Sequence, residues 1–182
     1  MRPYIILSSV ATANISPIQA QKLRQRLIVR DGNESKLYEA IGDIKWGPDG
    51  EHFAFTGTGP NKKTLVVHDG TEGNAYDFIY NLTFSLDGKH LAYSARRDGK
   101  FLVVRDGKEG AVYEQVKELA FSPDSGHLSY LGRQGTNWVA VLDETATQPY
   151  SHILNPRWKD NGALDFFAVR DEQIYRVSAT PK

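Results

Sequence analysis

The stretch NLTFSLDGKHLAYSARRDGKFLVVRDGKEG, Asn81 to Gly110, is one copy of a unit that the chain repeats imperfectly along its length. Five columns of residues recur in phase, with spacings of 38, 37 and 37 residues between successive copies. The columns are Asp31, Asp69, Asp106 and Asp143; Tyr38, Tyr76, Tyr113 and Tyr150; Ile41, Ile79, Val116 and Ile153; Trp46, Phe84, Phe121 and Trp158; and Asp49, Asp87, Asp124 and Asn161. A period near 40 with strand-like content is typical of a β-propeller blade, whereas a helical solenoid would space its apolar residues about 3.6 positions apart.

Local signals inside one unit predict four antiparallel strands. Residues 118–122 (ELAFS) predict the innermost strand, and PDSG at 123–126 predicts the tight turn after it. The second and third strands are predicted at 91–95 and 101–105 of the central copy, and Asp106-Gly107 turns the chain again. The apolar runs are nearly continuous, as expected when both faces of a sheet are buried against neighbours.

A distance argument limits the outer strand. From Tyr113 to Glu118 the extended chain spans about 17 Å. Crossing three strand spacings takes about 14 Å. We therefore expect the outer strand to end near Tyr113, with residues 114–117 as an extended crossover and Val116 packed under the blade.

Both ends of the chain predict incomplete blades. Tyr4 to Leu7 align with a second strand, residues 18–26 after Ser16-Pro17 predict a short helix, and 26–29 predict a third strand. A signal peptide within residues 1–13 is an alternative interpretation of the beginning. At the far end, 163–168 and 173–177 match a second and a third strand, so that the last blade lacks its outer strand.

The predicted fold class is therefore all-β, a β-propeller of about five four-stranded blades. Three blades are complete, beginning near Asp43, Asn81 and Glu118, the first lacks its innermost strand and the last lacks its outer strand. We expect residues 1–182 to form a single propeller domain, or a segment of a larger propeller. Open sheet edges at the two ends are normally paired or covered, so we expect them to pair with each other, with a second copy or with another protein segment.

The composition excludes several classes of partner. The chain has 22 Lys and Arg against 22 Asp and Glu, which gives no electrostatic case for nucleic acid or an anionic membrane surface. It has no cysteine, which excludes disulfides and thiol chemistry, and no apolar run of the roughly 20 residues that a membrane span needs. Its 40% hydrophobic and 24% charged residues are ordinary for a soluble globular protein.

The repeated motif x-L-x-F-S-P-D-G-K-x-L-A-Y, followed by G-K-x-L-V-V-x-D-G, resembles the TolB-type, WD-like bacterial β-propeller repeat. The resemblance covers Tyr4 to Val177 and weakens in the last unit, where WKDNG at 158–162 replaces the Ser-Pro-Asp-Gly turn. It implies a propeller fold and a role as a protein-interaction domain, a periplasmic scaffold component or the gating domain of a prolyl-oligopeptidase-like enzyme. A periplasmic or otherwise extracytoplasmic location is implied in the same way.

Signals of catalysis or cofactor binding are poor. The sequence has no G-x-S-x-G, H-E-x-x-H, P-loop or G-x-G-x-x-G motif, so no cofactor is expected. His52, His90 and His127 recur with the repeat and look like a metal site, yet equivalent positions in adjacent blades lie too far apart for ligand bonds of about 2.1 Å. We expect them to be structural, with no metal. The Asp69-Gly70 and Asp106-Gly107 tags predict turns rather than calcium loops.

The candidate binding residues lie on the innermost strands. One column holds Asp43, Asn81, Glu118 and Asn155. The column two residues further along each strand holds Lys45, Thr83, Ala120 and Arg157. Because innermost strands line a propeller's channel, the predicted binding site is a polar ring of Asp43, Lys45, Asn81, Glu118, Asn155 and Arg157. The tyrosine column and the Trp46, Phe84, Phe121, Trp158 column are interpreted as packing between blades.

Two functions remain open at this point. The first is a non-enzymatic interaction module that binds a protein or peptide through the propeller face or its open edges. The alternative is a small glycan-binding or glycan-hydrolysing propeller with Asp43 and Glu118 at the axis. A glycosidase needs two carboxylates about 5 to 9.5 Å apart, which is the feature that separates the two hypotheses.

Overall fold

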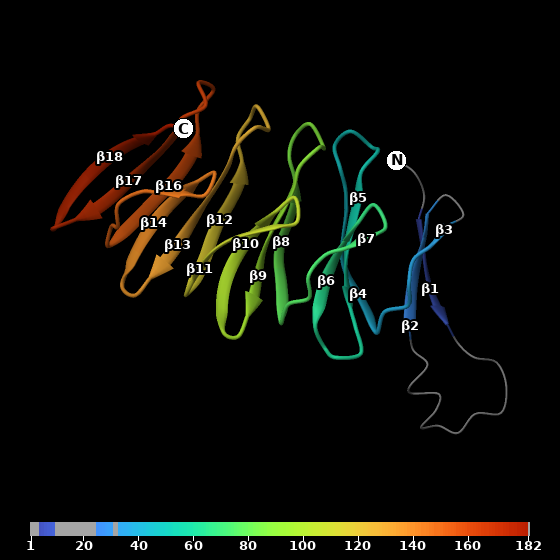
Figure 1. Cartoon of the computed structure of the whole chain (residues 1–182). Helices are drawn as coiled ribbons and strands as arrows, with labels where there is room; N and C mark the ends of the chain where they lie inside the picture. The colour runs from blue at the N-terminus through green and yellow to red at the C-terminus, as the bar shows by residue number, and fades with distance from the viewer. Residues whose placement is uncertain (1–3, 10–24, 31–32, 182) are drawn as a thin grey trace.

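The computed structural model describes residues 4–9, 25–30 and 33–181, with the backbone alone for 4–9. Its described residues contain strands and turns and no helix. The strands form five separate antiparallel sheets, which we number in chain order and which follow one another in a row (Figure 1). The prediction of about five propeller blades is thereby confirmed.

Each sheet is built from strands that are consecutive in sequence. The first contains β1 (Tyr4–Ser9), β2 (Gln25–Arg30) and β3 (Asn33–Glu34); the second β4 (Ala40–Trp46), β5 (Phe53–Thr58), β6 (Thr64–His68) and β7 (Thr71–Glu72); the third β8 (Phe78–Phe84), β9 (Leu91–Arg97), β10 (Lys100–Arg105) and β11 (Lys108–Tyr113); the fourth β12 (Gln115–Phe121), β13 (Leu128–Gln134), β14 (Asn137–Leu142) and β15 (Thr145–Ala146); and the fifth β16 (His152–Trp158), β17 (Leu164–Arg170) and β18 (Gln173–Ala179). Within the described residues, the first sheet has no innermost strand and the fifth has no outer strand, as predicted.

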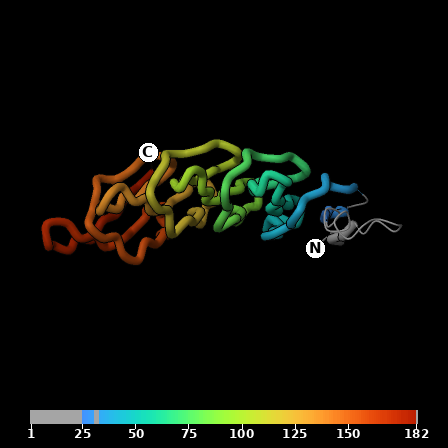
Figure 2. The backbone as a smooth tube through the Cα atoms, turned by 90° about the horizontal axis from the view of Figure 1, so that it is seen from below, coloured from blue at the N-terminus to red at the C-terminus, as the bar shows by residue number. Residues whose placement is uncertain are grey.

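The row of sheets is open within the described residues. The first and fifth sheets lie at opposite ends of the row, and no strand pairing joins them in the part of the chain that the structure describes (Figures 1 and 2). The residues expected to ring a closed channel therefore lie along the inner edge of an open row, which is the edge formed by the innermost strands β4, β8, β12 and β16. Pairing of the end sheets with a second copy stays a prediction.

The predicted turn chemistry is confirmed at one end of the sheets. The turn after each innermost strand closes with a backbone hydrogen bond, from Gly50 to Gly47, Gly88 to Ser85, Ser125 to Ser122 and Gly162 to Lys159, at 2.9–3.0 Å. The turns between the third and outer strands place Asp69 and Asp106 at φ of 46° and 50°, each followed by a glycine at positive φ. Asparagine, aspartate and glycine tolerate this left-handed region, which the paired turn geometry requires.

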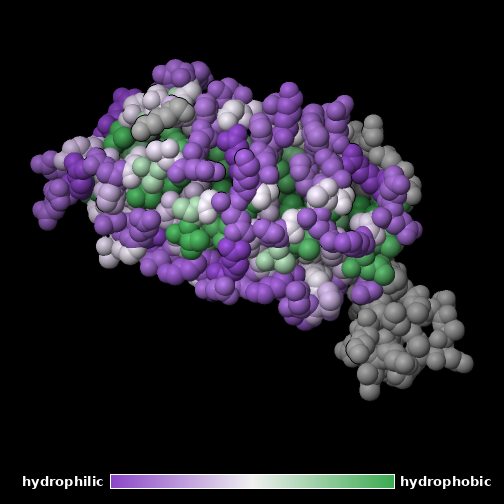
Figure 3. Space-filling model, in the orientation of Figure 1, coloured by the Kyte–Doolittle hydropathy of each residue, from purple (hydrophilic) through white to green (hydrophobic). Residues whose placement is uncertain are grey.

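The apolar core lies between the sheets rather than inside any one of them. Each of four clusters of buried residues joins two neighbouring sheets; the cluster between the second and third sheets includes Ala54, Val66, Tyr76 and Tyr93. All four tyrosines of the repeat are buried, at 0–4% exposure. In the space-filling view, apolar patches show between ridges of polar side chains (Figure 3). Stacking of neighbours is thus what buries each apolar face.

The innermost strands begin earlier than the sequence predicted. β12 starts at Gln115, so residues 115–117 are strand, and the crossover from β11 is reduced to Glu114. The cause is tertiary: the ring of Tyr113 lies directly against Gly132 of the next sheet, and the Glu114 N–H already donates to the Arg133 carbonyl at 3.0 Å. The twist of the packed sheets brings the end of β11 over β13, so no wide crossing is needed. Val116 is buried, as expected.

The predictions for the beginning of the chain can be compared with the structure only at residues 4–9 and 25–30. Tyr4–Leu7 do lie in a second strand, β1, which pairs with β2 over its whole length; the register of the pairing makes Tyr4 equivalent to Ala92 of the central copy. The predicted helix lies largely outside the described residues, and its last two positions are strand, since β2 starts at Gln25. No helix in the described residues is long and apolar enough to cross a membrane.

The aromatic column of Trp46, Phe84, Phe121 and Trp158 is half-buried rather than fully enclosed. Phe121 stacks on the His90 ring with centroids 6.4 Å apart, and the Arg105 guanidinium lies 5.7 Å from its centroid. We expect Phe121→Ala to lower the free energy of unfolding by about 2 kcal/mol, below the 3–5 kcal/mol of a fully buried aromatic. Urea unfolding measures this, with Leu86→Ala on an exposed turn as the control. A loss as small as the control's would contradict the packing role.

Candidate functional site

The predicted ring residues occupy equivalent irregularities in four successive sheets. Asp43, Asn81, Glu118 and Asn155 all lie where the pairing of the innermost strand shifts register, and all four are exposed. Asn81, Glu118 and Asn155 have φ of 55°, 56° and 51°, the left-handed conformation of a bulged residue. A bulge leaves one residue out of the hydrogen-bond ladder and re-aims its side chain. The repeat therefore presents one polar side chain per sheet along the inner edge.

The structure brings only some of these residues together. Asn155 and Arg157 line a cavity of about 270 Å³ on the fifth sheet, together with Lys159, Asp165 and Arg176. Asp165 accepts a hydrogen bond from Arg176 at 2.9 Å, which holds its pKa below the ordinary value. The cavity has three cations against one carboxylate, and hence excess positive charge.

Asp43 and Glu118 do not form a close pair. They belong to the second and fourth sheets, and the third sheet lies between them (Figure 1). Packed sheets are about 10 Å apart, so two intervals exceed the 5 to 9.5 Å that a pair of glycosidase carboxylates requires. Lys45 is exposed on β4 of the second sheet, and the third and fourth sheets separate it from Arg157 on β16.

Two exposed aromatic residues beside Asn81 were missed by the sequence reading. Phe78 and Tyr80 of β8 are 53% and 40% exposed, with ring centroids 6.3 Å apart. The ring centroids of Tyr80 and Phe101 are 6.1 Å apart. The Arg96 guanidinium lies 5.9 Å from the Phe101 centroid. The sequence predicted that this strand begins near Asn81, after both aromatic residues. Their period-two aromatic alternation was the available signal for a strand with one exposed face.

The fourth sheet continues this aromatic strip with a cation. The Lys117 ammonium lies 4.2 Å from the Trp138 ring centroid, and Lys117 immediately precedes the bulged Glu118. Along β8 and β12 the inner edge thus combines exposed rings, a carboxylate, an amide and an ammonium. We call Phe78, Tyr80, Asn81, Lys117 and Glu118 the inner-edge strip.

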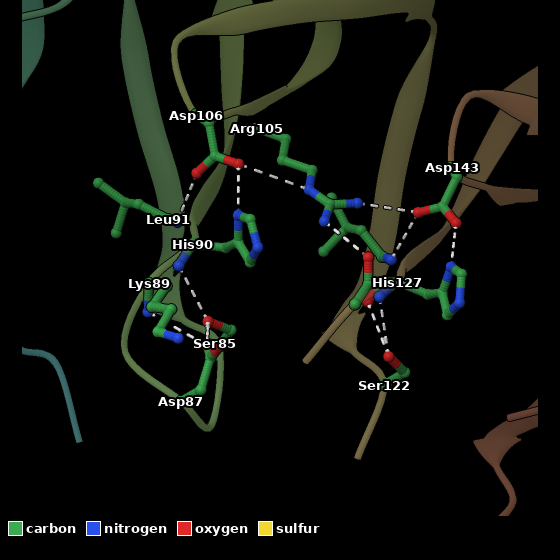
Figure 4. Close-up of polar contacts among 12 residues, drawn as sticks. Ser85, Asp87, Lys89, His90, Leu91, Arg105, Asp106, Ser122, His127 and Asp143 are labelled. Carbon is green, nitrogen blue, oxygen red and sulfur yellow. Dashed lines mark hydrogen bonds and ion pairs between the residues drawn. The ribbon is translucent and has the colours of Figure 1, made fainter. Parts of the chain in front are cut away.

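A second set of polar residues lies at the turn end of the sheets (Figure 4). In the third sheet His90 Nδ1 lies 2.8 Å from Asp106 Oδ2, and the Leu91 N–H donates to Asp106 Oδ1 at 2.9 Å. His127 bonds Asp143 in the fourth sheet, and His52 bonds Asp69 at 2.7 Å in the second. The three repeat histidines therefore each join strands of their own sheet, which agrees with the structural role predicted for them.

An arginine links neighbouring sheets within this network. Arg105, the last residue of β10, donates to Asp143 Oδ1 of the fourth sheet at 2.9 Å and to the Gly126 carbonyl at 2.7 Å (Figure 4). Arg30, the last residue of β2, reaches Asp69 of the second sheet at 2.9 Å in the same way. The equivalent position holds His68 in the second sheet and Leu142 in the fourth, so the link is not repeated there.

The second sheet consequently has two imidazoles at one carboxylate. Burial alone would raise the pKa of Asp69, but hydrogen bonds from His52, the Phe53 N–H and Arg30 outweigh it and hold that pKa below its usual value. The hydrogen bond with Asp69 in turn raises the pKa of His52. His68 Nε2 lies 3.4 Å from Asp69 Oδ2.

No protein-family model and no curated protein matches this sequence. Among solved structures, the chain is similar to the β-propeller domain of the Trilobed protease from Pyrococcus furiosus, described as having an open velcro topology, with a TM-score of 0.50 and 12% identity over 86% of this chain and 62% of that chain. It also overlays an acylaminoacyl peptidase from Pyrococcus horikoshii (TM-score 0.48, 13% identity, 97% of this chain and 37% of that chain). TolB from Acinetobacter baumannii gives a TM-score of 0.43 and 13% identity over 87% of this chain and 49% of that chain.

The chain therefore spans less than two thirds of the length of these proteins. The likeness to the first of them confirms the β-propeller fold that the repeat predicted.

Proposed function

Because the chain is a β-propeller, we propose that it is a non-enzymatic interaction module that binds a peptide segment of a protein partner along its inner-edge strip. The observation that carries this proposal is the exposure of Phe78 and Tyr80, 53% and 40%, on a strand in the middle of the row. Large exposed aromatic side chains on a rigid element contribute much contact area at a low cost in conformational entropy.

The polar members of the strip suit an extended peptide. Asn81 offers an amide for backbone hydrogen bonds, although its Nδ2 also lies 3.3 Å from the Ser94 hydroxyl. Glu118 accepts hydrogen bonds or meets a cation, and Lys117 meets an anion. On the second and fifth sheets, Lys45 and Arg157 extend the recognition to anionic groups, and Asp43 and Asn155 supply further polar contacts. Aromatic anchors surrounded by polar groups are typical of sites that bind peptides.

The glycan alternative has weaker support. Aromatic rings also stack on sugars, but hydrolysis needs a pair of carboxylates, and Asp43 and Glu118 lie two sheets apart. A glycan-binding role without hydrolysis is distinguished from peptide binding by the experiment below.

The test starts from a random-peptide phage library panned on the wild-type protein, followed by calorimetry of the selected peptides. We expect the Phe78→Ser/Tyr80→Ser variant to weaken their binding by about tenfold or more, because truncation of an aromatic anchor typically costs 2 kcal/mol or more. An Asp43→Ala/Glu118→Ala variant tests the predicted ring in the same assay.

The matched control is Leu86→Ser, which removes a 67% exposed apolar side chain at the turn end of the same sheet. Circular dichroism melting confirms that all variants fold. Peptides that bind equally to the wild type and to the Phe78/Tyr80 variant would place the site elsewhere. Failure to select peptides, together with hits on a glycan array, would favour the alternative.

A further inference from the structure

We propose that His52, His68 and Asp69 of the second sheet form a binding site for a transition-metal ion, with Zn²⁺ as the best-fitting ion. One ligand atom from each of the three residues lies within 4.8 Å of the other two. His52 Nδ1 is 2.7 Å and His68 Nε2 is 3.4 Å from Asp69 Oδ2. Two imidazoles and a carboxylate are a ligand set that leaves a tetrahedral zinc ion one open position.

The site arises from one departure from the repeat. In the third sheet Arg105 stands directly before Asp106, and in the fourth sheet Leu142 stands before Asp143. The second sheet has His68 at this position. Because Ala54 of β5 pairs with His68 of β6, the His68 ring comes beside the ring of His52, with centroids 5.8 Å apart. The second sheet alone of the described sheets therefore combines two imidazoles with the repeat aspartate.

The carboxylate is oriented for this role. Asp69 Oδ1 accepts hydrogen bonds from the Phe53 N–H and from Arg30, both at 2.9 Å, so that Oδ2 is the oxygen that meets both histidines. Hydrogen bonds of this kind hold a metal ligand in place. Asp49 Oδ2 lies 3.7 Å from His52 Nε2, too far for a hydrogen bond but close enough to favour a proton on that nitrogen and leave Nδ1 to the ion.

The imidazole of His68 has a ring nitrogen that an ion would satisfy. The Nε2 atom of His68 is buried and forms no hydrogen bond with the described residues, because its contact with Asp69 Oδ2 at 3.4 Å lacks hydrogen-bond geometry; the side chain as a whole is 33% exposed. A buried ring nitrogen without a partner is costly, and a metal ion satisfies it. The partial exposure of all three side chains, 33–39%, leaves a route for the ion and room for a water as the fourth ligand.

The distances suit zinc after a small adjustment. Zinc bonds of about 2.0–2.1 Å in tetrahedral geometry set donor atoms roughly 3.3 Å apart. The His68–Asp69 distance of 3.4 Å already fits, and the His52–Asp69 distance of 2.7 Å widens when the ion replaces the proton between the two groups. Binding requires neutral histidines, so the proton on His52 Nδ1 moves to Nε2, or leaves to solvent where the ring is protonated.

The test is calorimetric titration of the untagged protein with Zn²⁺, supported by the visible absorption of Co²⁺ as a probe of tetrahedral coordination. We expect about one equivalent of Zn²⁺ to bind and to raise the melting temperature. His68→Arg and His68→Leu introduce the residues that the third and fourth sheets carry at this position, so the fold is expected to tolerate them. Both variants should weaken Zn²⁺ binding by a factor of 10 to 100 or more.

The matched control is His90→Gln, which removes the equivalent of His52 from the third sheet. It should leave the Zn²⁺ affinity unchanged. A wild-type protein that takes up no Zn²⁺, or a His68→Arg variant that binds it as tightly, would overturn the proposal. Loss of binding in His90→Gln as well would do the same, because it would assign the ion to another set of histidines.

Discussion

Replacing Tyr76 by alanine should lower the free energy of unfolding by about 3–5 kcal/mol, the usual cost of truncating a fully buried aromatic residue. Tyr76 is 0% exposed and packs edge-on against Tyr93, with centroids 6.2 Å apart, in the core between the second and third sheets. Two twisted sheets joined by short turns collapse poorly into the cavity that remains, so most of the lost contact energy is not recovered.

The hydroxyl of Tyr76 adds a smaller contribution. It donates to Glu109 Oε1 at 2.8 Å, and Arg97 holds the same carboxylate with two hydrogen bonds of 2.9 and 2.7 Å. These bonds, led by that of Arg97, keep the pKa of Glu109 below its usual value. Tyr76→Phe should therefore cost only about 1 kcal/mol, because Glu109 keeps its arginine partner.

Urea unfolding followed by circular dichroism measures both changes. The control is Tyr80→Ala, which removes the same kind of side chain from an exposed site and should cost less than about 1 kcal/mol. If Tyr76→Ala costs no more than Tyr80→Ala, the tyrosine column does not hold the sheets together.

Gly132→Val should destabilise the protein by about 3 kcal/mol, at the upper end of the range for overpacking. A Cβ atom at this position would lie 2.4 Å from Cδ1 of Tyr113, well inside contact distance, and Gly132 is buried in β13. Gly57 and Tyr38 are arranged in the same way, because a Cβ atom added at Gly57 would lie 2.6 Å from Cδ1 of Tyr38. The third sheet has Ala95 at the equivalent position. Tyr113 has to move before a branched side chain fits, and its movement disturbs the interface with the next sheet.

The matched control is Gly126→Val, at an exposed turn where the nearest atom is 3.6 Å from the added Cβ. It should change the free energy of unfolding far less. Because Gly132 and Tyr113 are in contact, a Gly132→Val/Tyr113→Ala double variant should be less destabilised than the sum of its single changes. Additive losses would show that the close approach of ring and backbone is not the cause.

Much of the fold was predictable because its determinants are local and repeated. Nearly continuous apolar runs, Asp-Gly turns and the tyrosine spacing predicted the five sheets, the tight turns and the two incomplete end blades. The incorrect predictions concerned packing between sheets. The distance argument treated the path from Tyr113 to Glu118 as a crossing of one flat blade, whereas sheet twist places Tyr113 directly over Gly132. The strand β12 consequently begins at Gln115, and the aromatic exposure on β8 was overlooked.

The sequence by itself determined which residues are equivalent, because a repeat imposes the same local hydrogen bonds and turns on every copy. It identified Asp43, Asn81, Glu118 and Asn155 as one column, and His52, His90 and His127 as another. Only the tertiary structure decided which unlike residues meet. His52 and His68 are neighbours because two antiparallel strands bring their ends together. Phe78 and Tyr80 remain exposed on β8, the edge strand of its sheet. Contacts between different columns depend on strand pairing and sheet twist, which a repeat period does not contain.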